Sequence, residues 1–271
     1  MTSEYSPNPP EVSVLSRGLS ILRAFAPRNG WLSNHQIADA VGLPRPTVSR
    51  ITANLTSLGY LEYAAAQGQY RLGTAALALG YGAFSSLDVW TVARPYLCAL
   101  ARDTDALAVL SLRDGMHMVC NEVFHGEHIL TLRLNAGSRM QLPHSTMGHA
   151  LVGKLAGSER QALLDEVRER FPDEWATLEP ALEDAARQVQ RRGFCATLGT
   201  AERGVNGVGC VLDLRNAPTT YVLGCAAPAL RFPPERLENE IGPRLMQIKA
   251  SIERQLGETV GAESAGVGAL E

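Results

Sequence analysis

Residues 37–50 read IADAVGLPRPTVSR, and this stretch decides the fold of the N-terminal part of the chain. Gly42 lies where a helix must end in a tight turn, and Pro44 suits only the start of a new helix. Ala38, four residues before the glycine, is small enough to let two helices cross closely. The pattern predicts a helix, a glycine-containing turn and a second helix, which is the helix-turn-helix arrangement. The side chains expected to form its core are Ile37, Val41, Val48 and Ile51.

The flanking sequence predicts the rest of a winged domain. Residues 13–25 read as a first helix, and Ser33 is positioned to cap the next one over residues 34–41. The third helix is expected to stop at Gly59. The apolar stripe of the first helix comprises Leu15, Leu19, Leu22 and Phe25. Two β-prone runs around a small polar turn predict a hairpin, the wing, formed by residues 60–63 and 69–72.

Polar side chains remain on the outer face of the third predicted helix. Arg45 and Arg50 can bind guanine or phosphate, and Thr47 and Ser49 offer short hydroxyls. No acid lies between residues 44 and 58 to repel a DNA backbone. Residues 1–73 carry a net charge of +2, whereas the remainder carries −5, which also suits a DNA-binding head. We therefore expect these four side chains to contact double-stranded DNA. The alternative is that both arginines only solvate a surface helix.

The second strand of the wing carries two further candidates for DNA contact. Gln69 and Arg71 are expected to reach the neighbouring phosphates or the minor groove. The alternative is that Arg71 pairs with an acidic side chain instead.

Together these motifs resemble the IclR-type transcriptional regulators. The resemblance rests on SRGLSIL at residues 16–22, on residues 37–50, on LGY at 58–60 and on YRLG at 70–73, and it covers residues 13–256. It implies a DNA-binding regulator that is not an enzyme, needs no cofactor, and binds a DNA operator and a small-molecule effector. It also implies a homodimer or homotetramer, which is expected because one recognition helix contacts only a few base pairs.

The remainder of the chain predicts an α+β domain. Runs at 107–113 and 116–121 flank Asp114-Gly115, a strong hairpin signal. Strands, helices and strands with short connections indicate an antiparallel sheet flanked by helices. The resemblance implies a domain similar to GAF domains. Further strands are expected at 128–134, 208–214 and 221–225, and helices at 74–86, 89–102, 147–156, from 158 onward, at 180–193 and at 234–256.

The predicted fold class is therefore α+β: an N-terminal winged helix-turn-helix joined by a helix to a GAF-like antiparallel-sheet sensor domain. The expected divisions are a disordered N-terminus (1–12), the DNA-binding domain (13–73), a linker helix (74–87), the effector-binding domain (88–256) and a disordered tail (257–271).

The resemblance implies that residues 137–148, 199–209 and 224–228 lie at an effector cup. Gly207, Gly224 and Ala226 stand where the family often has hydroxyls, thiols or an acid, which indicates a larger cup for a bulkier, less polar ligand such as an aromatic one. Gln141 replaces the family's usual proline, and Pro143 follows two places later. An alternative for Ser145 or Thr146 is that it caps a helix. The candidate effector contacts are His144, Ser145, Met147, Gly148, Val205, Gly207, Gly209, Gly224 and Ala226.

Other classes of protein are disfavoured by composition and spacing. No apolar run approaches a membrane span and no signal-peptide pattern opens the chain, so a cytoplasmic location is expected. The five scattered cysteines are expected to be reduced and buried. The glycines of residues 199–209 lack the spacing of a phosphate loop, and residues 125–128 (HGEH) favour a surface turn over a zinc site. We find no catalytic constellation. The main rival is a DNA-binding scaffold with a vestigial, ligand-free sensor domain, and an enzyme with an N-terminal docking module is a weaker one.

Overall fold

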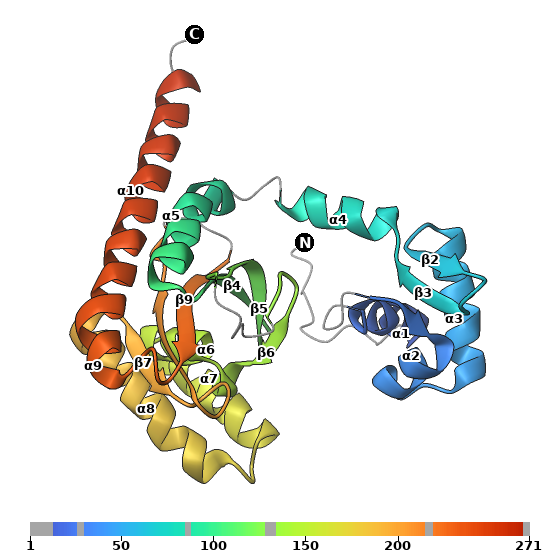
Figure 1. The fold of residues 1–271 in the computed structure, drawn as a ribbon, viewed down its shortest axis with the longest axis horizontal. Helices are drawn as coiled ribbons and strands as arrows, with labels where there is room; N and C mark the ends of the chain where they lie inside the picture. Colours follow the sequence, from blue (N-terminus) through green and yellow to red (C-terminus); the bar gives the residue numbers. More distant parts are fainter. Residues whose placement is uncertain (1–12, 26–29, 85–87, 128–133, 215–218, 268–271) are drawn as a thin grey trace, which may run out of the picture. The chain divides into compact units, whose positions relative to one another are not determined.

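The computed structural model divides into two units, residues 1–86 and residues 87–271. It describes residues 13–25, 30–84, 88–127, 134–214 and 219–267. Figure 1 shows a small helical unit carrying a short sheet and a larger unit built around a curled sheet. None of the helices formed by these residues combines the length and hydropathy needed to cross a bilayer.

The small unit has the predicted winged helix-turn-helix fold. Its core contains Ile37, Val48 and Ile51, as expected, with Ile21 and Leu61. The hairpin pairs antiparallel, and a third, unpredicted strand joins it through a pair between Leu32 and Tyr70. The elements are α1 (Ser13–Arg23), β1 (Leu32–Ser33), α2 (Asn34–Val41), α3 (Arg45–Ser57), β2 (Leu61–Ala64), β3 (Gln69–Leu72) and α4 (Thr74–Phe84).

One feature of α1 differs from the prediction. Leu15 and Leu19, expected in the core, are 61% and 49% exposed, and Val14 is 62% exposed. Phe25 of the predicted stripe is in the core, Leu22 packs against it, and Ile21, which was not in the stripe, also fills it. The small unit therefore buries only the C-terminal half of the apolar stripe and leaves the N-terminal half in solvent.

The larger unit contains one antiparallel sheet in the order β6-β5-β4-β9-β8-β7. Its strands are β4 (Leu107–Asp114), β5 (His117–Phe124), β6 (Arg139–Gln141), β7 (Cys195–Leu198), β8 (Val205–Val211) and β9 (Tyr221–Pro228). The hairpin at Asp114-Gly115 forms as predicted, with Gly115 at positive φ. The short strands β6 and β7 were not predicted, because three or four residues carry too little alternation to be recognised.

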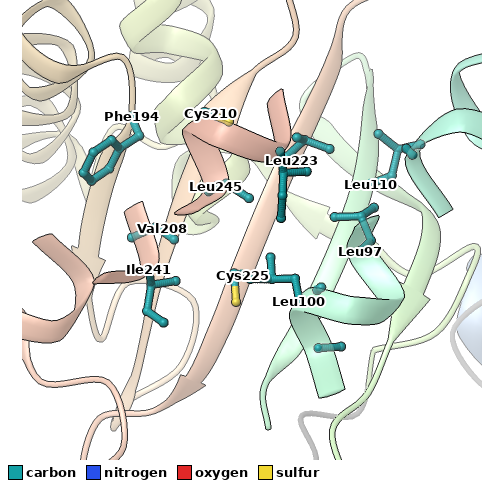
Figure 2. Packing of buried hydrophobic residues seen from close by; sticks show 14 of the residues in the cluster. Leu97, Leu100, Leu110, Phe194, Val208, Cys210, Leu223, Cys225, Ile241 and Leu245 are labelled. Atoms are coloured by element: carbon teal, nitrogen blue, oxygen red, sulfur yellow. The ribbon is translucent and has the colours of Figure 1, made fainter. Parts of the chain in front are cut away.

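Helices cover both faces of this sheet. They are α5 (Asp88–Thr104), η1 (Leu142–His144), α6 (Thr146–Lys154), α7 (Gly157–Arg170), α8 (Trp175–Arg192), α9 (Pro234–Arg236), η2 (Leu237–Ile241) and α10 (Gly242–Val267). Successive strand residues point to opposite faces, so Leu110 packs with α5 and α10, whereas Val109 packs with α6 to α8. Figure 2 shows the first of these layers, with Leu97 and Leu100 of α5 beside Leu223 and Cys225 of β9.

Several helix boundaries correct the sequence prediction. Helix α8 begins at Trp175, before Pro180, and Leu178 in its first turn is buried. Burial of that leucine outweighs the one backbone hydrogen bond that the proline removes. Helix α7 begins at Gly157, one residue before the predicted start at 158, and has no side-chain cap. Helix α10 continues to Val267, past the expected start of the disordered tail at Gly257. The extension contains three glycines, at 257, 261 and 266, and each costs about 1 kcal/mol in a helix.

Some predictions fall on residues that the structure does not describe. These are the N-terminus 1–12, the end of the linker at 85–87, most of the strand expected at 128–134, and the last four residues of the tail, 268–271. All five cysteines are free thiols, and four of them are buried, but Cys98 is exposed, contrary to expectation.

Candidate functional site

The turn between α2 and α3 fixes the candidate DNA-binding surface. Ser33 caps α2: its Oγ accepts a hydrogen bond from Gln36 N, and the Gln36 side chain accepts one from Ser33 N. Gly42 has φ of 65°, a conformation that a side chain disfavours, and its N–H bonds the carbonyl of Ala38. This turn holds α3 at its crossing with α2, so the exposed side chains of α3 have a defined orientation.

The four predicted residues of α3 lie on or near its solvent face. Arg45, Ser49 and Arg50 are exposed, and Thr47 is half-buried. Among the described residues none pairs with Arg50. Helix α3 carries no acid. The sequence therefore brings a cationic, acid-free face to the surface, as recognition of a phosphate backbone requires.

Residues of α2 support two of these side chains. Asn34 Nδ2 donates to Ser49 Oγ across 2.5 Å, and Arg45 Nη2 lies 2.7 Å from His35 Nδ1. His35 Nδ1 also lies 3.3 Å from Asp39. Sequence reasoning missed Asn34 and His35, because the crossing of two helices, and not spacing along one of them, brings them beside α3.

The wing residues are partly engaged within the unit. Arg71 pairs with Glu62 across the hairpin, with Nη2 2.5 Å from Oε2, and its guanidinium lies 4.9 Å from the centre of the Trp31 ring. Gln69 pairs with Ser33 and Ala64 in the strand register. The acidic partner considered for Arg71 is thus Glu62. A surface ion pair of this kind contributes at most about 1 kcal/mol, so it can be exchanged for a phosphate.

A cavity of about 350 Å³ lies at one end of the sheet in the larger unit. Five of the nine predicted effector contacts line it: His144, Met147, Val205, Gly224 and Ala226. Most of the remaining lining residues are apolar, and four of the nine come from β4 and β6. The lining residues that were not among the nine predicted contacts are Leu107, Val109, Leu134, Met140, Gln141, Thr146, Ala201, Glu202 and Cys225. Leu107 and Val109 alternate along β4, and this alternation was the signal available for finding them.

The other four predicted contacts serve the packing of α6. Ser145 is the N-cap of this helix: its Oγ accepts from Gly148 N at 3.0 Å. A Cβ at Gly148 would lie 1.9 Å from the Leu142 carbonyl oxygen, so this position has no room for one. Neither residue lines the described cavity.

Glycines in β8 and β9 form a floor for α6. A Cβ at Gly209 would lie 3.0 Å from the Thr146 carbonyl, and one at Gly207 would lie 3.0 Å from Thr146 Oγ1. At Gly224 the nearest atom would be Met147 Sδ, at 2.6 Å. Gly207 therefore supports α6 and does not line the cup, whereas Gly224 leaves room for Met147, which lines it. Their missing side chains leave space that α6 and Met147 fill.

The polar groups of the cavity are few. His144 Nε2 lies 2.8 Å from Glu174 Oε2, whereas its Nδ1 is buried and has no hydrogen-bond partner in the described structure. Thr146 Oγ1 bonds Thr197 Oγ1 at 2.5 Å. Glu202 is the one charged carboxylate among the described lining residues. The arrangement suits a mostly apolar ligand that offers a hydrogen-bond donor to an imidazole nitrogen.

The described residues offer no metal centre, and two of the buried thiols are unreactive. They contain no group of three or more His, Cys, Asp or Glu side chains that could hold a metal ion. His125 is within the described chain, but His128 of the same motif is outside it. Burial raises the pKa of the Cys195 and Cys210 thiols to about 12, which leaves them protonated and unreactive.

Comparison with protein families matches both units. The IclR helix-turn-helix domain matches residues 14–65, and the C-terminal domain of bacterial IclR transcriptional regulators matches residues 81–254. The chain is 28% identical to the HTH-type transcriptional regulator TsaQ1/TsaQ2 of Comamonas testosteroni, over 90% of this chain and 88% of that protein.

Solved structures show the same fold. An IclR family transcriptional regulator from Brucella abortus is 36% identical, with a TM-score of 0.76, over 94% of this chain and 96% of that one. An IclR homologue from Microbacterium hydrocarbonoxydans, complexed with 4-hydroxybenzoate, has a TM-score of 0.72 at 20% identity, over 91% of this chain and all of that one.

Proposed function

Because this chain belongs to the IclR family of transcriptional regulators, we propose that its small unit reads an operator with the exposed face of α3. The protein is a DNA-binding regulator of a family that is not enzymatic. The side chains that contact the bases and phosphates of the operator are those of Arg45, Thr47, Ser49 and Arg50. Gln69 and Arg71 contact the flanking phosphates. The observation that carries this assignment is the acid-free face of α3, on which no described residue engages Arg50.

The proposed division of labour follows the two units. Residues 13–73 bind DNA, residues 74–87 link, and residues 88–256 sense the effector. We assign the site of action to the cytoplasm, because the proposed target is chromosomal DNA.

The effector is a small, uncharged aromatic metabolite in the cavity beside α6. Apolar side chains of β4 and β6 match a ring, and a hydroxyl on that ring would donate to His144 Nδ1. Glu202 would repel a carboxylate ligand. The homologue complexed with 4-hydroxybenzoate supports an aromatic ligand. The proposed effector of this chain differs from 4-hydroxybenzoate in having no carboxylate.

The assembly is a homodimer or a homotetramer. Val14, Leu15 and Leu19 form an exposed apolar face on α1, and Leu77 and Leu79 are 59% and 62% exposed on α4. Apolar faces of this kind are typical of contacts between subunits. A second copy would also supply the second recognition helix that a two-fold operator needs.

The experiment is a footprint of the purified protein on the DNA upstream of its own gene and of the divergent neighbour. It is run with and without phenols, benzyl alcohols and their carboxylate analogues. A protected two-fold site that an uncharged aromatic compound shifts would support both assignments. Stabilisation against heat by the same compound, about 2.7 kcal/mol at one hundred times its Kd, would show that it binds the folded protein.

Two outcomes would contradict the proposal. If the protein bound no DNA fragment in a salt-sensitive way, the assignment of α3 as the recognition surface would be wrong. Specific DNA binding with no response in the whole ligand series would favour the scaffold with a ligand-free sensor domain.

A further inference from the structure

A second cavity, of about 400 Å³, lies against α6, α8, β7 and α9 in the larger unit. It shares no lining residue with the effector cavity. Its polar lining consists of His149, Asp184, Gln188, Thr197, Thr200 and Glu238. Neither the comparisons nor the proposed regulatory function gives it a role.

His149 supplies a buried hydrogen-bond acceptor. The residue is only 2% exposed, and its Nε2 lies 2.8 Å from the Pro143 carbonyl oxygen. A carbonyl only accepts, so the ring proton must be on Nε2, and Nδ1 keeps a lone pair. Burial lowers the pKa of this histidine, which keeps the ring neutral. Since no described residue bonds Nδ1, a ligand hydroxyl would complete its hydrogen bonding.

The carboxylates of this cavity are already neutralised. Asp184 accepts hydrogen bonds from Arg187 at 3.1 Å and Gln188 at 2.6 Å, and Glu238 pairs with Arg192 at 3.1 Å. Because the arginines already neutralise these carboxylates, a cationic ligand would gain little additional Coulomb energy by binding beside them. The carboxylate oxygens still have lone pairs for neutral donors.

The apolar part of the lining lies beside these polar groups. It consists of Ala181, Ala185, Ala196, Leu198 and Pro234. The small alanine side chains leave room for the C–H face of a saturated ring or chain. The hydroxyl of Thr200 adds a group that both donates and accepts, and it makes no hydrogen bond to the described protein.

We propose that this second cavity binds a small neutral polyol or monosaccharide, whose hydroxyls bond His149 Nδ1, the Asp184 and Glu238 carboxylates and Thr200. Three of these groups accept hydrogen bonds and the Thr200 hydroxyl can also donate one, so together they suit a ligand with several hydroxyls. The alanines lie against its carbon skeleton. The site shares no lining residue with the effector cavity and includes none of the proposed DNA contacts.

The test is calorimetric titration of the full chain with ribitol and D-xylose. Cadaverine serves as a cationic probe and benzyl alcohol as a probe of the effector cavity. Ala181→Leu fills the second cavity from an exposed helical position, so it should not disturb folding. Ala176→Leu, at an exposed position of the same helix outside the lining, is the matched control. Thr200→Val removes one hydroxyl at nearly constant volume.

We expect ribitol or D-xylose to bind the wild type and Ala176→Leu equally. Ala181→Leu should weaken that binding by about tenfold or more, and Thr200→Val by a few-fold. Benzyl alcohol and operator DNA should bind Ala181→Leu as they bind the wild type.

The inference is overturned by any of three results: neither polyol binds the wild type, polyol binding survives Ala181→Leu, or cadaverine binds more tightly than both polyols. Because benzyl alcohol and DNA are measured on the same protein, such a result would leave the proposed regulatory function standing. Conversely, loss of the DNA or benzyl alcohol response would not affect the polyol measurement.

Discussion

Arg45 Nη2 lies 2.7 Å from His35 Nδ1, so the first helix of the helix-turn-helix holds the leading arginine of the second. A guanidinium carries only hydrogen-bond donors, so His35 Nδ1 is the acceptor in this contact. This contact orients Arg45 before any DNA is bound.

Substituting the two partners together should reveal this orientation. Arg45→Ala is expected to cost about 1–3 kcal/mol of specific binding and to relax one base preference. His35→Ala should cost less, and the double variant about as much as Arg45→Ala alone, because the histidine acts through the arginine. Binding is measured on operator and scrambled DNA, with exposed His125→Ala as control. Additive losses would mean that His35 contributes independently of Arg45.

Arg50 is expected to act mainly on the DNA backbone. Loss of one phosphate contact lowers the slope of log affinity against log salt by about one. Arg50→Ala should therefore weaken operator and scrambled DNA by the same factor and flatten the salt dependence. Titrations at several salt concentrations check this. An unchanged slope would mean that Arg50 contacts a base and not a phosphate, or that it does not contact DNA.

The glycines beneath and within α6 should respond very differently to a methyl group. Gly148→Ala puts Cβ against the Leu142 carbonyl and should destabilise the fold by about 3 kcal/mol or more. Gly224→Ala meets only the flexible end of Met147, so it should cost about 1 kcal/mol or less. It should still weaken effector binding, since the thioether must move toward the cavity. Urea unfolding and ligand titration separate the two effects, and equal destabilisation would contradict this packing.

The exposed face of α1 should matter for assembly and not for folding. The double variant Leu15→Ser/Leu19→Ser is expected to change unfolding free energy within about 0.5 kcal/mol, because both side chains are in solvent within one chain. It should shift the sedimentation equilibrium toward monomer and weaken operator binding. Leu58→Ser, at another exposed leucine of the same unit, is the matched control. A variant that assembles like the wild type would exclude α1 from the interface.

His149 should make the larger unit sensitive to acid. Burial is the main cause that lowers its pKa below 6.5, and the nearby His144 adds to this. Below that value the unfolded chain binds more protons than the folded one, so unfolding free energy falls as pH falls. Between about pH 7 and about pH 5, the unfolding free energy measured in urea should fall less for His149→Gln than for the wild type. Equal losses would mean that the folded protein accommodates the charged ring.

Local sequence determined the helix-turn-helix almost completely. The cap at Ser33, the left-handed turn at Gly42 and the start of α3 at Pro44 each depend on interactions within a few residues. The apolar spacing of residues 37–51 then leaves one way for the two helices to cross. The same locality explains why Arg45 and Arg50 were identified and why the hairpin at Asp114-Gly115 formed as predicted.

Only the tertiary structure decided the roles of the glycines and of the residues around α6. The residue types at Gly207, Gly209 and Ser145 do not reveal whether these residues line a cavity or support a helix. They support a helix because α6 lies against β8 and β9. The cavity wall from β4, the support of Arg45 by His35 and the second cavity at β7 likewise join segments far apart in the chain. Sequence periodicity reports which face of an element is buried, whereas a site depends on which elements meet, and long-range packing sets that.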